Sequence, residues 1–271
     1  MSIEVILILF AVGILAGILA GMFGVGGGII IVPALISVYS YMHITSPYTV
    51  HIAIATSLFT IIFTSISSTY KHSTHGNVVF GAALIIGLTS TVSVYLFSKI
   101  AVHMPGNLLK TIFSIIIAIV ALKLLLEKKK NEEENDKNSP AGFNRIYCLI
   151  IGIFTGIIAA FTGLGGGIFA VPLMHYLLKF NIKKAIGTST LAVLITALAG
   201  VISYVLNKPG DFSFNHYTLG LVDVYSALPI VAASIPFAQL GVWINKRTHN
   251  FILKKLFAVF VIAVSLKMLF F

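Results

Sequence analysis

A glycine cluster occurs twice in this chain, each time inside an apolar run. The first run is residues 23–33, FGVGGGIIIVP, and the second is residues 162–172, TGLGGGIFAVP. One constant offset aligns two sets of four glycines: Gly24, Gly26, Gly27 and Gly28 with Gly163, Gly165, Gly166 and Gly167. A helix that starts at such a cluster presents unpaired backbone N–H groups and the positive end of its dipole. The duplication therefore predicts an anion-binding site built from backbone, in preference to the alternative of close helix packing through small residues.

Two hydroxyl pairs repeat in the same way, at a slightly shorter offset. They are Thr56-Ser57 and Thr188-Ser189, each near the start of an apolar segment. A hydroxyl there can donate to an oxyanion or cap the helix, and a bond back to its own helix is the alternative. We expect the four hydroxyls to join the glycines in binding substrate.

Composition identifies the surroundings of these residues. Of 271 residues, 58% are hydrophobic and 10% are charged, and the mean hydropathy is +1.03. No soluble core needs so much apolar surface, so the sequence predicts an all-α polytopic membrane protein whose constant partner is the lipid bilayer. The net charge of +10 fits a topology bias in the loops, and nucleic acid is excluded as a partner.

The chain divides into a first transmembrane repeat (1–126), a charged linker (127–145) and a second transmembrane repeat (146–271). Each repeat begins with a hairpin around its glycine cluster, over residues 3–41 and 146–178. Three apolar segments of about 20 residues follow each hairpin. These segments cover residues 51–69, 78–98 and 108–126 in the first repeat and 185–206, 221–243 and 251–271 in the second.

The basic residues set the predicted orientation. If each hairpin returns to its own side, 14 of the 18 Lys and Arg fall on one face, and the other face keeps Lys99, Lys110, Lys208 and Lys267. A single interrupted span in each hairpin would split them evenly. The positive-inside rule therefore favours returning hairpins, inverted repeats, two outer termini and a cytoplasmic linker.

The arm of the second hairpin, residues 168–178, is too short to cross the bilayer. Its 11 residues give about 16 Å of helix, against roughly 30 Å of hydrocarbon. We expect two broken or re-entrant hairpins that enter from opposite faces and meet near the midplane, as in inverted-repeat secondary transporters.

Few side chains could support other chemistry. Acidic residues inside the apolar segments are nearly absent, and His51, His72 and His175 are the titratable candidates nearest to them. No catalytic triad, metal-ligand cluster or phosphate loop is present, and the single cysteine, Cys148, cannot form an intramolecular disulfide. The sequence predicts neither an enzyme, nor a cofactor, nor a metal site.

These motifs resemble the TauE/SafE family, the sulfite exporter and organosulfonate permease group. The resemblance is carried by the doubled Gly-X-Gly-Gly-Gly with its Val-Pro, by the runs at 53–57 and 185–189, and by Gly76-Asn77-Val78. It implies an integral permease that moves anions such as sulfite or organosulfonates, commonly outward. One departure is Ala55, which stands where the second repeat has Gly187.

Together these observations predict a secondary transporter, an exporter, of small sulfur-containing anions in the cytoplasmic membrane. It would work by alternating access, with the anion between the two glycine clusters and either a proton or sodium as coupling ion. An anion channel and a non-transport membrane scaffold are the alternatives.

Overall fold

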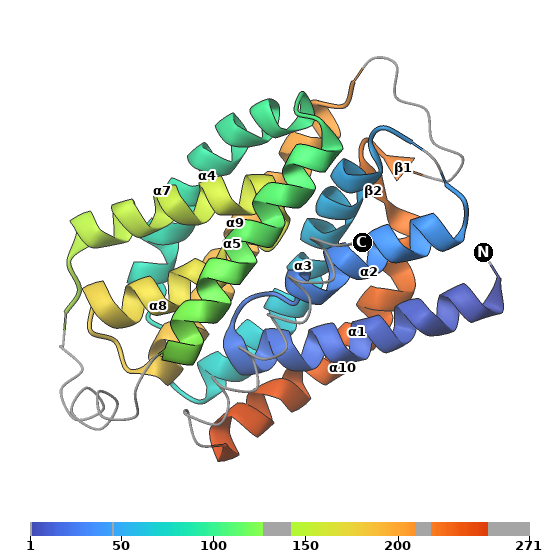
Figure 1. Cartoon of the computed structure of the whole chain (residues 1–271). Coiled ribbons are helices and arrows are strands. Elements are labelled where there is room, and N and C mark those ends of the chain that lie inside the picture. The colour runs from blue at the N-terminus through green and yellow to red at the C-terminus, as the bar shows by residue number, and fades with distance from the viewer. Residues whose placement is uncertain (1, 45, 127–141, 210–217, 249–271) are drawn as a thin grey trace.

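The computed structural model describes residues 2–44, 46–126, 142–209 and 218–248, and the side chains of residues 117–126 are outside this description. The described chain is helical except for one short hairpin, in which β1 (Thr218–Leu219) pairs antiparallel with β2 (Val222–Asp223) (Figure 1). The predicted all-α class is confirmed.

Helices follow the predicted order in both halves of the chain. The first half holds α1 (Ile3–Phe23), α2 (Gly28–Tyr41), α3 (Thr49–Thr74), α4 (Phe80–Val102) and α5 (Gly106–Leu126). The second half holds α7 (Arg145–Thr162), α8 (Gly167–Leu177), α9 (Ile182–Leu206) and α10 (Val224–Arg247). The predicted last segment, 251–271, and residues 127–141 of the predicted linker lie outside the described residues.

Six of the described helices are long and apolar enough to cross a membrane: α1, α3, α4, α7, α9 and α10. The two helices that follow the glycine clusters, α2 and α8, are shorter. With 11 residues, α8 has the length expected for an arm that cannot span the bilayer. Large apolar side chains such as Leu7, Leu88 and Leu228 are more than half exposed on the long helices, as contact with lipid requires.

The two halves interlock, because the first helix of each hairpin packs against a helix of the other half. In Figure 1, α1 runs beside α10 and α7 runs beside α4. Glycines let these backbones touch: a Cβ on Gly17 of α1 would lie 2.6 Å from the Ser234 carbonyl oxygen, and one on Gly156 of α7 would lie 2.4 Å from that of Ser90. Gly17 and Gly156 are related by the same offset as the two glycine clusters. The two close helix contacts are therefore made by equivalent positions of the two repeats.

Candidate functional site

Each glycine cluster forms a break between two helices. Helix α1 ends where Gly24 adopts a left-handed conformation with φ 68°, and its N–H donates to the Ala20 carbonyl at 2.9 Å. Gly27, with φ 86°, then caps α2. Because positive φ values are readily adopted only by glycine, residue type fixes the turn.

The second cluster repeats this turn. Gly163, with φ 67°, ends α7 and donates its N–H to the Ala159 carbonyl at 2.9 Å, and Gly166, with φ 76°, caps α8. We name residues 24–28 the first tip and residues 163–167 the second tip. Both tips are buried.

The two tips touch each other. A Cβ on Gly28, the first residue of α2, would lie 2.7 Å from the Gly163 carbonyl oxygen, and one on Gly167, the first residue of α8, would lie 2.4 Å from that of Gly24. Each short helix therefore starts directly against the other tip. The structure brings together all eight glycines that the sequence selects.

Two aliphatic side chains contact both tips. A Cβ on Gly26 would lie 2.8 Å from Ile61 Cγ2 and 3.2 Å from Val193 Cγ1, and one on Gly165 would lie 2.7 Å from Val193 and 3.4 Å from Ile61. Ile61 and Val193 are themselves related by the offset that relates the two hydroxyl pairs. Residue type gives no sign of this role, and the repeat offset relates the two residues without singling them out.

The backbone N–H groups of the tips lack partners within the described chain. No acceptor among the described residues pairs with the N–H groups of Gly26, Gly27 and Gly28, or with those of Gly165, Gly166 and Gly167. Buried N–H groups are nearly always hydrogen-bonded, because a lone one loses its water without compensation. Two opposed sets of donors therefore lie buried and in contact, and binding of an anion by them stays a prediction.

Ser57 and Ser189 bind the tips to the helices of the opposite half. The Ser57 hydroxyl donates to the Gly163 carbonyl at 2.9 Å, and the Ser189 hydroxyl donates to the Gly24 carbonyl at 2.9 Å. Since a serine hydroxyl has one proton, neither can also donate to an anion in this arrangement. The structure places both next to the tips, and contact between either of them and substrate stays a prediction.

Thr56 and Thr188 form a second matched pair of contacts between the halves. Thr56 Oγ1 accepts from the Asp223 N–H at 2.9 Å, immediately before α10, and Thr188 Oγ1 accepts from the Val79 N–H at 3.0 Å, immediately before α4. Each threonine thus fixes the start of a helix in the other half. Substrate contact by these hydroxyls also stays a prediction.

All these contacts are reciprocal when the two halves are exchanged. A further example is Gly24, whose Cβ would lie 2.6 Å from the Ile186 carbonyl oxygen, and Gly163, whose Cβ would lie 2.9 Å from that of Ile54. A local two-fold axis that relates the first tip to the second tip produces such paired contacts. The inverted orientation of the repeats in the membrane stays a prediction.

The histidines named from the sequence each face a backbone carbonyl. The nearest ring nitrogens lie 3.1 Å from Ala101 O for His51, 3.0 Å from Gly21 O for His72 and 2.8 Å from Phe180 O for His175. Each histidine therefore has a positioning role within the fold.

Asp223 is the only buried carboxylate in the described part of the chain. One of its oxygens caps α10 by accepting the N–H groups of Tyr225 and Ser226 at 3.0 and 3.2 Å, and the other accepts the Tyr39 hydroxyl at 3.0 Å. These three hydrogen bonds satisfy both oxygens of the Asp223 carboxylate, which explains how it can be buried. No group of three or more His, Cys, Asp or Glu that could hold a metal ion occurs within the described residues.

Long apolar helices, a buried pair of broken-helix tips and a buried set of hydroxyls define a polytopic helical membrane protein. The family model of the sulfite exporter TauE/SafE matches residues 9–268, and the chain belongs to this family. No solved structure gives a significant match.

Relatives cover nearly the same length. A probable membrane transporter protein of Haemophilus influenzae is 31% identical over 97% of this chain and 97% of its own. One of Methanocaldococcus jannaschii is 29% identical over 89% of this chain and 86% of its own, and one of Bacillus subtilis is 26% identical over 90% and 89%. Family and relatives together support a membrane transporter, and they agree with the prediction that the chain is not an enzyme.

Proposed function

We propose that this protein is a secondary transporter that exports small sulfur-containing anions, such as sulfite or organosulfonates, across the cytoplasmic membrane. The anion binds between the first and second tips and reaches either side by alternating access. The family model of a sulfite exporter supports the class of substrate. A proton or sodium serves as coupling ion, and both termini lie outside.

One observation carries the proposal: two sets of buried N–H groups, without acceptors in the described chain, lie on tips that touch. Helix N-termini stabilise anions by dipole and by direct donation, and they require no cationic side chain. Neither of the two described acidic residues belongs to the tips, and both accept tyrosine hydroxyls elsewhere, so no carboxylate of the described chain lies in the tips to oppose an anion.

Ile61 offers a sharper test than the glycines do. A Cβ at Gly27 would lie 2.7 Å from the Ala16 carbonyl oxygen, so larger residues there disturb packing as well as binding. Because Ile61 contacts both tips, an Ile61→Asp substitution places a carboxylate beside the anion. At about 5 Å and an effective dielectric constant of about 20 the repulsion is about 3 kcal/mol, or more than a hundredfold in affinity.

The matched control is Ile61→Asn, which has nearly the same shape as the Asp variant and no charge. Binding is measured as the rise in unfolding temperature of purified protein with sulfite, sulfate, thiosulfate and organosulfonates at fixed pH, since a ligand of the native state must stabilise it. We expect one or more of these anions to stabilise the wild type and the Asn variant but not the Asp variant. Equal stabilisation of both variants by the anions would mean that the tips serve helix packing and do not bind the anion.

Flux in liposomes separates the alternatives. A transporter shows saturable exchange, whereas large electrical currents would favour an anion channel. A membrane scaffold predicts neither flux nor stabilisation by any of these anions.

A further inference from the structure

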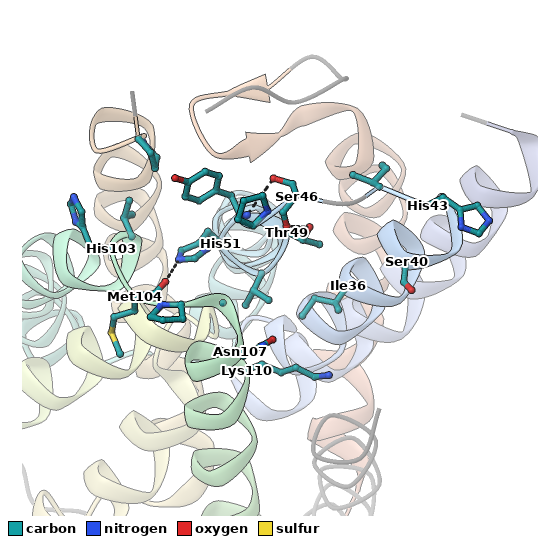
Figure 2. Close-up of a pocket in the computed structure, with 18 residues that line it drawn as sticks. Ile36, Ser40, His43, Ser46, Thr49, His51, His103, Met104, Asn107 and Lys110 are labelled. Carbon is teal, nitrogen blue, oxygen red and sulfur yellow. Dashed lines mark hydrogen bonds between the residues drawn. The ribbon is translucent and has the colours of Figure 1, made fainter. Parts of the chain in front are cut away.

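A pocket with a volume of about 1050 Å³ opens mainly between helices and loops of the first half, away from the tips. Its walls come from the last turns of α2, the loop between α2 and α3, the start of α3, the turn between α4 and α5, and the start of α5, with Pro209 of the second half (Figure 2). The charge count predicts that this side of the protein faces outward.

Lys110 gives the pocket its charge. It is half-buried on α5, and none of the lining residues is acidic. The two acidic residues of the described chain, Glu4 and Asp223, both lie outside the lining, so Lys110 has no carboxylate partner there. Figure 2 shows Lys110 and Asn107 projecting from α5 toward Ile36 and Ser40 of α2, with their polar ends in the space between the helices.

The wall that carries these two residues is held in place by His51. This side chain is 1% exposed, and its Nε2 lies 3.1 Å from both the Ala101 and the Met104 carbonyl oxygens. Two carbonyl acceptors require the proton on Nε2, so His51 donates to the turn between α4 and α5. The start of α5, with Asn107 and Lys110, is therefore fixed against α3 before any ligand binds.

The pocket is separate from the tips. Ile36 lines it, and Gly28 begins α2 in the first tip. Eight residues of helix separate the two, which is about 12 Å along the axis. A small anion in the pocket cannot contact the tip glycines at the same time.

We propose that this pocket is a second anion-binding chamber, in which Lys110 and Asn107 hold a sulfate- or sulfonate-sized anion on its way to or from the tips. The proposed transport function supplies the class of anion, while the chamber itself follows from a half-buried cation that has no carboxylate partner among the described residues and lies in a preformed pocket. The ammonium group supplies the charge, and the Asn107 amide supplies directed donors.

Exchange of the lysine is the first test. In liposomes, Lys110→Met should raise the anion concentration for half-maximal flux about tenfold when anion is varied on the pocket side, and Lys110→Arg should restore most of the affinity. Lys99→Met is the matched control, because Lys99 is exposed on α4 over the Tyr95 ring and does not line the pocket. Equal effects of Lys110→Met and Lys99→Met would overturn the proposal.

Thiol labelling tests occupancy without transport. The native Cys148 is buried, so Ser40→Cys, on the α2 wall of the pocket, provides a single accessible thiol while Lys110 and Asn107 stay in place. We expect an anionic methanethiosulfonate that carries a sulfonate to react faster than its trimethylammonium analogue, sulfate to slow the reaction, and Lys110→Met to remove both effects. Faster reaction with the cationic reagent, or no protection by sulfate, would contradict the chamber.

The vesicle composition and the tip variants separate the remaining explanations. Protection by sulfate in pure phosphatidylcholine supports a free anion, whereas protection seen only with added phosphatidylglycerol assigns the pocket to a lipid headgroup and overturns the proposal. If Ile61→Asp abolishes flux while sulfate still protects Ser40→Cys, the chamber and the tips are distinct sites. If Ile61→Asp leaves flux intact while Lys110→Met weakens it, the chamber stands and the tip site fails.

Discussion

The contact between the two tips can be tested by adding one methyl group to each short helix. Gly28 and Gly167 are suited to this, because both have ordinary helical φ values, so alanine there brings no backbone strain. The added Cβ would meet the carbonyl oxygen of the opposite tip at 2.7 Å for Gly28→Ala and at 2.4 Å for Gly167→Ala. The added Cβ would also lie 3.0 Å from Ile61 Cδ1 in Gly28→Ala and 2.9 Å from Val193 Cγ2 in Gly167→Ala, so the variants report on the packing of the tips together with these two side chains.

The structure sets the size of the effect. Ordinary contact begins near 3.4 Å, so the tips must separate by about 0.7 Å in Gly28→Ala and about 1.0 Å in Gly167→Ala. Overpacking of this kind costs roughly 1 to 3 kcal/mol. By the scaling for domains of 150–250 residues this lowers the unfolding temperature by roughly 2 to 12 °C. We expect the larger loss for Gly167→Ala, and weaker anion binding for both, because the two sets of donors move apart.

The assay is thermal unfolding of the purified variants, with and without the anion that most stabilises the wild type. Gly142→Ala is the control, since nothing lies within 4 Å of its added Cβ, and it should leave both quantities unchanged. Wild-type stability and wild-type anion response in Gly28→Ala and Gly167→Ala would refute the direct contact between the tips.

Three further predictions concern the paired serines, Asp223 and the orientation of the chain in the membrane. Ser57→Ala and Ser189→Ala should each lower the free energy of unfolding by about 1 to 3 kcal/mol and by similar amounts, because each leaves one buried carbonyl unpaired; a large inequality would argue against the two-fold relation. Asp223→Asn keeps the oxygen that caps α10 but loses the acceptor for a tyrosine hydroxyl, so it should lower stability and preserve flux; loss of flux with normal stability would assign Asp223 to coupling. Impermeant thiol reagents applied to intact cells should label Leu219→Cys and spare Thr74→Cys, and the reverse pattern would invert the proposed orientation.

Composition and repetition predicted most of the architecture. The density of apolar residues requires a membrane protein because no aqueous fold can bury so much surface. The two breaks follow from residue type, since φ values of 67° to 86° at Gly24, Gly27, Gly163 and Gly166 are accessible to few residues other than glycine. The predicted length of the second hairpin's short arm is confirmed by the 11 residues of α8, because the ends of a helix depend on local sequence signals.

Hydroxyl roles could not be predicted from sequence. Ser57 and Ser189 look equally suited to bind an anion or a carbonyl, and the choice depends on which atom another helix brings within reach. That atom is the carbonyl of a tip in the opposite half, far away along the chain. Ile61 and Val193 were missed for the same reason, since an aliphatic side chain acquires its role from its neighbours.

The sequence by itself determined a duplicated membrane protein with two glycine breaks, because composition, helix length and backbone freedom are local properties of the chain. Only the tertiary structure decided that the breaks touch, that serines and threonines join each half to the other, and that Lys110 lies in a pocket without a carboxylate partner among the described residues. Those facts depend on which helices pack together, and here the pairs α1 with α10 and α4 with α7 cross between the repeats.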